Sequence, residues 1–346
     1  MKPIVIGHRG ASGYRPEHTR SAFELAFALG ADAVEPDIVA TRDGVLVVRH
    51  ENEISGTTDV ASRPEFADRR ATKRIDGKVL TGWFTEDFTW AELSTLRARE
   101  RLPEVRRSSA TFDGRFPILR LRDVFELIDR ASGSAKRRLG MVAEIKHSTY
   151  FASIGLPLDE LFAAEVNTAG WNAGDGRLVI ESFEQDVLRK IYARGIYGKR
   201  VYLLEARGKP FDEVTRLGAK APHYADYLTE AGLYGLSGRV NGISVDKSLI
   251  LATDERGDED EDEDTDGDGD GGGASGLVDQ AHAAGLEIYC WTLRPENRFL
   301  ARANRRGRLK SDFGDWPAEF RTIMGTGIDG VFADHPDLAV LVRDER

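Results

Sequence analysis

Short apolar runs recur along the chain, and most are separated by stretches in which apolar residues return at helical spacing. Phe23, Ala26 and Phe27 show this spacing after the first run. Alternating strand and helix segments predict an α/β fold, a (β/α)8 TIM barrel, with an open doubly wound sheet as the structural alternative. The eight runs predicted as barrel strands are residues 3–8, 33–39, 140–146, 178–182, 200–204, 241–245, 287–291 and 329–333.

A ninth apolar run, residues 45–49, breaks this alternation. Only residues 41–44 separate it from the second predicted strand, which leaves no room for a crossover helix, and Asp43-Gly44 is a hairpin signal. We therefore expect a hairpin that folds His50 back over the barrel mouth, where it can face His8.

Residues 53–116 are too many for an ordinary loop and contain their own aromatic residues, together with an expected helical stretch over 90–99. We interpret residues 1–346 as a single catalytic TIM-barrel domain with a small insertion domain at about 53–116. A lid over the site and a surface decoration that stabilises the hairpin both fit this pattern.

Polar residues interrupt the apolar runs at the predicted strand ends, where the chemistry of such barrels is found. Positions i and i+2 of a strand share one face, so Glu35 and Asp37 project together, as do Glu144 and Lys146. Carboxylates can hold a hard cation, an arginine and a lysine can bind phosphate, and histidines can exchange protons near neutral pH. These types indicate metal-assisted cleavage of a phosphate ester. The set is His8, Arg9, Glu35, Asp37, His50, Glu144 and Lys146.

Several motifs, in order from the first strand to the last, resemble those of the glycerophosphodiester phosphodiesterase family, of the type with an insertion domain after the second catalytic histidine. The resemblance covers nearly the whole chain. Its motifs are His8-Arg9-Gly10-Ala11 with residues 16–19, Glu35-Pro36-Asp37, residues 47–51, Glu144-Ile145-Lys146, Glu181-Ser182-Phe183, Cys290-Trp291-Thr292 and residues 330–337.

The resemblance implies roles for individual residues. His8 and His50 match the general acid/base pair, Arg9 and Lys146 match the phosphate-binding residues, and the matching metal ligands are Glu35, Asp37 and Glu144.

The chain departs from the family pattern at Glu51, where Asp is common, and at His18, where Asn is common. We expect neither residue to contact a metal ligand or an acid/base residue. Glu17 is expected to organise the turn after the first strand. Trp291, at the end of a strand, is either a wall for the substrate or part of the core.

The resulting prediction is metal-dependent hydrolysis of glycerophosphodiesters, such as glycerophosphocholine and glycerophosphoethanolamine, to sn-glycerol 3-phosphate and an alcohol. Ca²⁺ is the expected cofactor and Mg²⁺ the alternative. A phospholipase-D-like activity on lysophospholipids and a catalytically silent phosphodiester-binding barrel are the other two hypotheses. Either water or the glycerol 2-hydroxyl can be the nucleophile. The general acid that protonates the leaving group can be either His8 or His50.

The charge distribution limits the classes of molecule that the chain can be expected to bind. The net charge is −10, but residues 254–270 alone carry −11, so the rest of the chain is near neutral at +1 and shows no basic stripe for nucleic acid. We expect the acidic loop at about 254–275 to be disordered.

No apolar run reaches transmembrane length, so no stable membrane insertion is expected. The single cysteine, Cys290, excludes an internal disulfide and is expected to be buried. We expect a cytoplasmic protein if Met1 is the native start, or an exported one if a signal peptide has been removed. The oligomeric state is left open.

Overall fold

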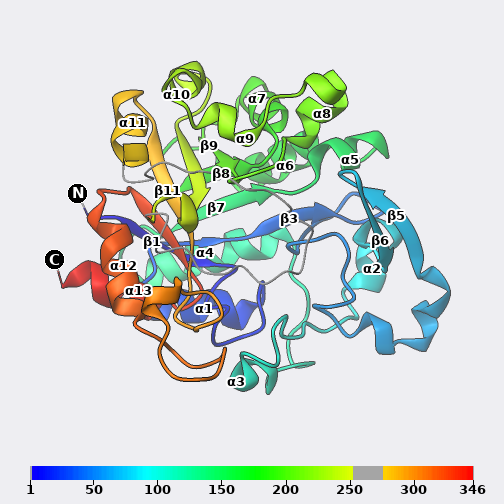
Figure 1. Ribbon diagram of the computed structural model, residues 1–346. Helices are drawn as coiled ribbons and strands as arrows, with labels where there is room; N and C mark the ends of the chain where they lie inside the picture. The colour runs from blue at the N-terminus through cyan, green and yellow to red at the C-terminus, as the bar shows by residue number, and fades with distance from the viewer. Residues whose placement is uncertain (1, 252–275, 346) are drawn as a thin grey trace.

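A closed barrel of parallel strands forms the centre of the molecule (Figure 1). The computed structural model describes residues 2–251 and 276–345. The strand order is β2-β1-β12-β11-β10-β9-β8-β7-β3-β4, and an additional pairing of β2 with β7 closes the ring. The predicted TIM barrel is confirmed. Its strands are β1 (Ile4–His8), β2 (Ala33–Glu35), β3 (Asp37–Ala40), β7 (Gly140–Ile145), β8 (Leu178–Ser182), β9 (Lys199–Leu204), β10 (Gly242–Asp246), β11 (Glu287–Leu293) and β12 (Gly330–Ala333).

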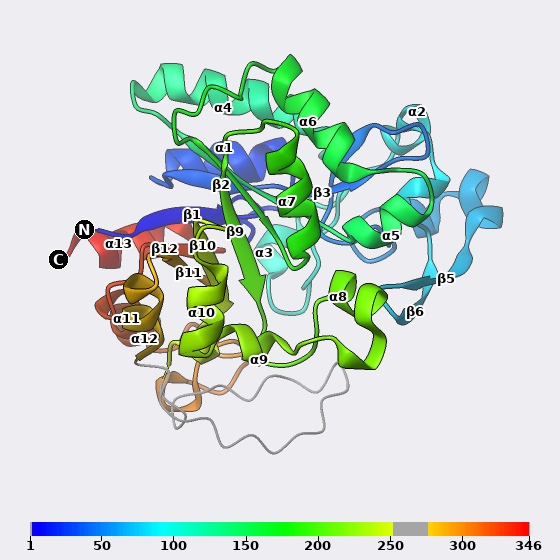
Figure 2. The same ribbon diagram turned by 90° about the horizontal axis from the view of Figure 1, so that it is seen from above.

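Helices surround the barrel, as the two perpendicular views show (Figures 1 and 2). The α-helices are α1 (Arg20–Ala28), α2 (Trp90–Leu93), α3 (Arg107–Ala110), α4 (Leu121–Ala135), α5 (Ser148–Ser153), α6 (Leu158–Thr168), α7 (Gln185–Ala193), α8 (Phe211–Leu217), α9 (Tyr224–Tyr227), α10 (Glu230–Leu236), α11 (Leu277–Ala283), α12 (Trp316–Gly325) and α13 (Pro336–Asp344). The 3-10 helices are η1 (Val60–Ser62), η2 (Pro64–Arg69), η3 (Thr85–Asp87), η4 (Gly218–Lys220), η5 (Lys247–Leu249) and η8 (Arg302–Asn304).

The strand expected over residues 33–39 is divided at Pro36. Proline has no N–H to donate to a neighbouring strand, and β2 ends before it while β3 begins after it. The first half pairs with both β1 and β7, and the second half pairs with β7. The two halves therefore act as one barrel strand whose polar residues, Glu35 and Asp37, flank the break.

An apolar layer fills the barrel and supports the polar residues above it. It is made of Ile6, Ala33, Val142, Val179, Val201, Tyr289 and Phe332. Side chains alternate along a strand, so the residue two positions further along lies on the same inward face. On six of these strands that residue is polar or amphipathic: His8, Glu35, Glu144, Glu181, Trp291 and Asp334. The carboxyl ends of the strands therefore carry the candidate chemistry.

The predicted hairpin is confirmed. Strand β4 (Leu46–Val48) pairs antiparallel with β3, with Ile38 opposite Val48. The turn contains Gly44 at φ 76°, a conformation that favours glycine. After the hairpin, the N–H of Arg49 donates to the carbonyl of Asp37 (2.9 Å). This bond returns the chain to the barrel mouth just before His50.

The segment after the hairpin contains a small antiparallel sheet of β5 (Ala71–Ile75) and β6 (Lys78–Gly82), seen beside α2 and α5 in both views (Figures 1 and 2). The buried aromatic residues of this segment include Phe66 and Phe88, whose rings lie 5.1 Å apart. They belong to the same hydrophobic core as residues of the barrel strands and of the surrounding helices.

The helix expected over residues 90–99 is wrong beyond Leu93. A capping box of Thr89 and Glu92 starts α2, but this helix has only four residues. Bridges pair Ala98 with Thr58 and Arg97 with Pro117, so long-range pairing replaces the helix.

Three further expectations concern composition. Cys290 is buried and unpaired, as predicted. Among the described residues, the helices are all too short or too polar to cross a membrane. The acidic loop expected at about 254–275 lies outside the described residues.

Candidate active site

A turn after β1 positions the first polar residues. Arg9 and Gly10 have φ values of 59° and 89°, which reverse the chain at the strand end. A Cβ at Gly10 would lie 2.6 Å from the backbone carbon of Ala22, so only glycine fits against α1. This turn directs the N–H of Arg9 to the Oε2 of Glu35, at 3.0 Å.

Four buried carboxylates line the barrel mouth. The strand register places Asp37 beside Glu144 and Glu144 beside Glu181, while Glu35 lies beside His8. Glu35, Glu144 and Glu181 each offer an oxygen within 4.8 Å of the others, a spacing that suits a shared cation. The structure thus brings two of the three predicted ligands together and adds Glu181.

Asp37, the third predicted ligand, contacts a histidine and an arginine. Its Oδ2 lies 3.1 Å from the Nε2 of His18 and 3.4 Å from the Nε of Arg9. Burial opposes the charged form, but Lys146 and His18 hold the pKa of Asp37 well below its usual value. Asp37 is therefore a carboxylate anion at the edge of the three-glutamate group.

The three glutamates repel one another. Burial and the nearby Asp37 raise the pKa of Glu144 to about 8, and burial with the neighbouring carboxylates raises the pKa of Glu35 and of Glu181 well above the usual value. Both oxygens of Glu181 have no hydrogen-bond partner among the described residues. A divalent cation fits this donor set, because it supplies the partners that these oxygens lack.

The charge balance agrees with this fit. Glu35, Asp37, Glu144 and Glu181 would carry four negative charges when ionised, and the cations that contact them, Arg9 and Lys146, carry two positive charges. A divalent ion would neutralise the remainder.

Arg9 and Lys146, the predicted phosphate-binding residues, face this group. The Nζ of Lys146 lies 2.7 Å from Oε1 of Glu144, and a guanidinium nitrogen of Arg9 donates to Oε2 of Glu17 at 3.2 Å. Glu17 thus positions Arg9 as well as the turn in which it lies. Both cations are almost fully buried, which strengthens their attraction for an anion at the mouth.

His8 forms a histidine–carboxylate pair with Asp334. Its Nδ1 lies 2.5 Å from Oδ1 of Asp334, at the end of β12, while its Nε2 lies 3.7 Å from Oε2 of Glu35. The carboxylate fixes the tautomer with the proton on Nδ1, so Nε2 is left to exchange protons. Burial and the Arg9 guanidinium lower the pKa of His8 to about 4, so the ring is neutral at neutral pH.

His50 forms a second pair of the same kind. Its Nδ1 lies 2.5 Å from Oε1 of Glu51. The expectation that Glu51 and His18 contact no ligand or acid/base residue is wrong, since Glu51 binds His50 and His18 contacts Asp37. A glutamate side chain is long enough to fold back onto the preceding ring. Burial and Arg9 lower the pKa of His50 below its usual value.

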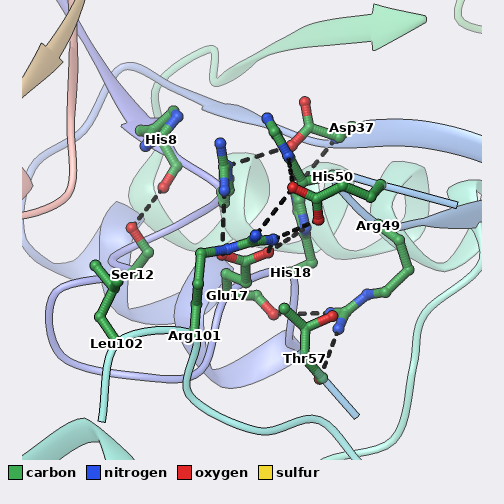
Figure 3. Close-up of polar contacts among 12 residues, drawn as sticks. His8, Ser12, Glu17, His18, Asp37, Arg49, His50, Thr57, Arg101 and Leu102 are labelled. Carbon is green, nitrogen blue, oxygen red and sulfur yellow. Dashed lines mark hydrogen bonds and ion pairs between the residues drawn. The ribbon is translucent and has the colours of Figure 1, made fainter. Parts of the chain in front are cut away.

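Figure 3 draws His8 and His50 in one close-up, above Glu17 and Arg101 in that view, and the Arg9 guanidinium lowers the pKa of both rings. The hairpin therefore does what its position in the sequence suggested: it brings the second histidine to the site of the first.

Trp291 lies on the inward face of β11, half-buried, with its ring 6.0 Å from that of Phe183. Phe183 in turn lies 5.8 Å from the Nζ of Lys146. The two rings thus form an apolar boundary beside the cationic end of the site.

Sequence reasoning missed Glu181 and Asp334 as site residues, although both lie in motifs that it identified. A signal existed: each stands two positions after an apolar inward residue, Val179 or Phe332. The same period-2 rule that selected Glu144 would have selected them.

The chain matches the model of the glycerophosphoryl diester phosphodiesterase family over residues 8–338. It is 30% identical over 345 residues to glycerophosphodiester phosphodiesterase GDPD6 of Arabidopsis thaliana, an alignment that covers 96% of this chain and 84% of that protein.

Solved structures share the fold. A putative glycerophosphoryl diester phosphodiesterase from Silicibacter pomeroyi aligns with a TM-score of 0.67 and 20% identity, over 99% of this chain and 93% of that one. A phosphodiesterase from Oleispira antarctica, solved in complex with the product sn-glycerol-3-phosphate, aligns with a TM-score of 0.61 and 19% identity, over 99% and 97%.

Proposed function

The chain belongs to the glycerophosphoryl diester phosphodiesterase family, and we propose that this phosphoric diester hydrolase cleaves glycerophosphodiesters such as glycerophosphocholine and glycerophosphoethanolamine to sn-glycerol 3-phosphate and an alcohol. The observation that carries the proposal is the meeting of two histidine–carboxylate pairs, two buried cations and a cluster of buried carboxylates at one barrel mouth. The product bound by the Oleispira antarctica neighbour supports the same substrate class.

Glu35, Glu144 and Glu181 are the residues that would hold a cation, with Asp37 as a further carboxylate next to them. We propose Ca²⁺, because a site of several carboxylates on different strands suits the larger ion with its flexible coordination, and Mg²⁺ is the alternative. When bound, the ion neutralises charge on the phosphate and polarises its oxygens.

The phosphate is held by Arg9 and Lys146. Both cations are buried, and their present partners, Glu17 and Glu144, orient them toward the mouth. The apolar side of the substrate packs on Trp291 and Phe183, next to the lysine. The phosphate would then lie next to the cation site, because Lys146 contacts Glu144.

His8 and His50 exchange the protons of the reaction through Nε2, because Nδ1 of each ring is held by a carboxylate. One neutral imidazole removes a proton from the nucleophile. The other, protonated when the anionic substrate is bound, gives its proton to the leaving alkoxide. Asp334 and Glu51 stabilise the positive ring in each case.

The test measures release of glycerol 3-phosphate from glycerophosphocholine with and without chelator, for the wild type and for His8→Ala and His50→Ala. We expect activity that chelation abolishes and that added Ca²⁺ restores. Full activity after exhaustive chelation would remove the metal from the proposal, and binding without turnover would indicate a silent barrel. Release of choline from lysophosphatidylcholine at a greater kcat/KM would favour the lipid substrate.

A further inference from the structure

Both histidine–carboxylate pairs are held from outside by arginines of the same short segment of the insertion. This segment, residues 100–106, is called the bracing segment below. We propose that its residues Arg101 and Arg106 are positioning residues that orient His50 and His8, so that the insertion completes the active site. The inference rests on the proposed function, because it assumes that these histidines exchange protons with the substrate.

Arg101 binds two carboxylates at once. Two of its nitrogens donate to the two oxygens of Glu51, at 2.9 and 2.8 Å, and it also donates to Oε2 and Oε1 of Glu17, at 2.8 and 2.7 Å. Glu51 is the partner of His50, and Glu17 is the partner of Arg9. One planar guanidinium therefore fixes the orientation of an acid/base ring and of a phosphate-binding side chain.

Arg106 acts on the other histidine. It is buried, donates from a terminal nitrogen to Oδ2 of Asp334 at 2.5 Å, and donates from Nε to Oε1 of Glu296 at 2.8 Å. Asp334 thus binds His8 with one oxygen and Arg106 with the other. The Nε of Arg294 shares Oδ2 at 2.8 Å, so Asp334 keeps one cation if Arg106 is removed.

The bracing segment is itself fixed. Buried Glu100 accepts from the N–H of Leu102 at 2.9 Å and from the hydroxyl of Ser109 at 2.5 Å, and the N–H of Glu100 donates to Asp113 at 2.7 Å. These internal hydrogen bonds hold Arg101 and Arg106 of the bracing segment in place. If the insertion only decorated the surface, these arginines would not need to contact Glu51 and Asp334, the carboxylates that bind the two histidines.

The two arginines are expected to differ in effect. Among the described residues, one arginine, Arg101, hydrogen-bonds Glu51, whereas two arginines hydrogen-bond Asp334. Loss of Arg101 leaves Glu51 free to rotate away from the ring. We therefore expect Arg101→Ala to lower kcat by about 10- to 100-fold, as is typical when the partner of a catalytic ligand is removed, and Arg106→Ala to lower it less.

The experiment compares Arg101→Ala, Arg101→Lys and Arg106→Ala with the matched control Arg107→Ala. Arg107 is the next residue along, is exposed, and begins α3. Each variant is assayed for kcat and KM on glycerophosphocholine with saturating Ca²⁺, and its histidine rings are observed by ¹⁵N NMR. We expect lower kcat in Arg101→Ala and Arg106→Ala, with little change in KM in Arg106→Ala and a raised KM in Arg101→Ala, because Glu17, the partner of Arg9, also loses a contact. The tautomer signals should change for His50 in Arg101→Ala and for His8 in Arg106→Ala. Free guanidinium should partly rescue Arg101→Ala, and Arg107→Ala should not differ from the wild type.

The outcomes separate this inference from the proposed function. If the wild type releases glycerol 3-phosphate and His50→Ala does not, but Arg101→Ala keeps wild-type kcat and ring signals, the positioning role is refuted and the function stands. Loss of kcat with unchanged ring signals and no rescue also refutes it, in favour of a purely structural role. If the wild type is inactive, the proposed function itself fails. Should Arg101→Ala not fold, Arg101→Lys decides: a lysine cannot span both carboxylates, so lowered kcat with altered signals supports the inference and wild-type kcat overturns it.

Discussion

Replacing Glu181 by glutamine should raise stability without metal and reduce the stabilisation that metal gives. Glu181 is fully buried on β8, next to Glu144, and both of its oxygens lack partners among the described residues. An isosteric amide removes a negative charge from a crowded group of carboxylates. Without metal, the variant should therefore unfold at a higher temperature than the wild type. Burial raises the pKa of Glu181, so the wild type must either keep a repelling charge or take up a proton when it folds, and the amide does neither.

The size of the metal effect follows from linkage. An ion present at 100 times its Kd stabilises the folded state by about 2.7 kcal/mol. One kcal/mol shifts Tm by roughly 2–4 °C in domains of 150–250 residues, so we expect a shift of about 4–6 °C for this longer chain. If the amide weakens affinity by roughly 10- to 100-fold, the same ion concentration gives only about 0.4–1.4 kcal/mol. At least about half of the metal-induced shift should disappear.

The assay is thermal unfolding followed by circular dichroism, first in chelator and then with increasing Ca²⁺. Glu184→Gln is the matched control, because Glu184 is also a buried glutamate just after β8 but accepts from Thr149 instead of facing the cluster. The control should keep the full metal-induced shift. A wild-type shift in Glu181→Gln would refute the assignment of Glu181 to the cation site.

Four further predictions address single features. His8→Ala and His50→Ala should each lower kcat by roughly 10²- to 10⁴-fold, measured as glycerol 3-phosphate release, and a change of only a few fold would contradict acid/base roles. Since burial lowers the pKa of His8 to about 4, the unfolded chain binds the extra proton between about pH 6.5 and 4, and the free energy of unfolding should fall as pH drops through this window. Denaturant titrations at pH 7 and pH 5 should show a smaller fall for His8→Asn, and equal falls would refute the reasoning. Gly10→Ala should cost at least about 1 kcal/mol in denaturant unfolding, because it combines a φ of 89° with a backbone clash, whereas Gly56→Ala, with open space around it, should not. Trp291→Ala should raise KM for glycerophosphocholine more than it lowers kcat, and unchanged kinetics would assign this ring to the core alone.

Local signals in the sequence were sufficient for the barrel and its hairpin. Strand positions follow from short apolar runs, and the hairpin follows from Asp43-Gly44 and a connection too short for a helix. The inward direction of His8, Glu35 and Glu144 follows from period-2 alternation, which depends only on backbone geometry. These features are local in the chain, and local backbone geometry determines them.

Even local patterns failed where distant segments competed with them. Residues 94–99 have helical spacing but pair with residues near 58 and 117, because burial of these segments against each other outweighs helix propensity. The break of the second strand at Pro36 was visible in the sequence, yet only the pairing with β7 on both sides shows that the barrel tolerates it.

The partners of the candidate site residues were decided by tertiary structure alone. His8 meets Asp334 across 326 residues, because the first and last strands are neighbours in the closed ring. Glu181 joins Glu144 through the register of β7 and β8, and Arg101 and Arg106 reach Glu51 and Asp334 because the insertion folds back onto the mouth. The sequence by itself determined which residue types stand at the strand ends. Barrel closure and the docking of the insertion, which depend on long-range packing, decided which of them touch.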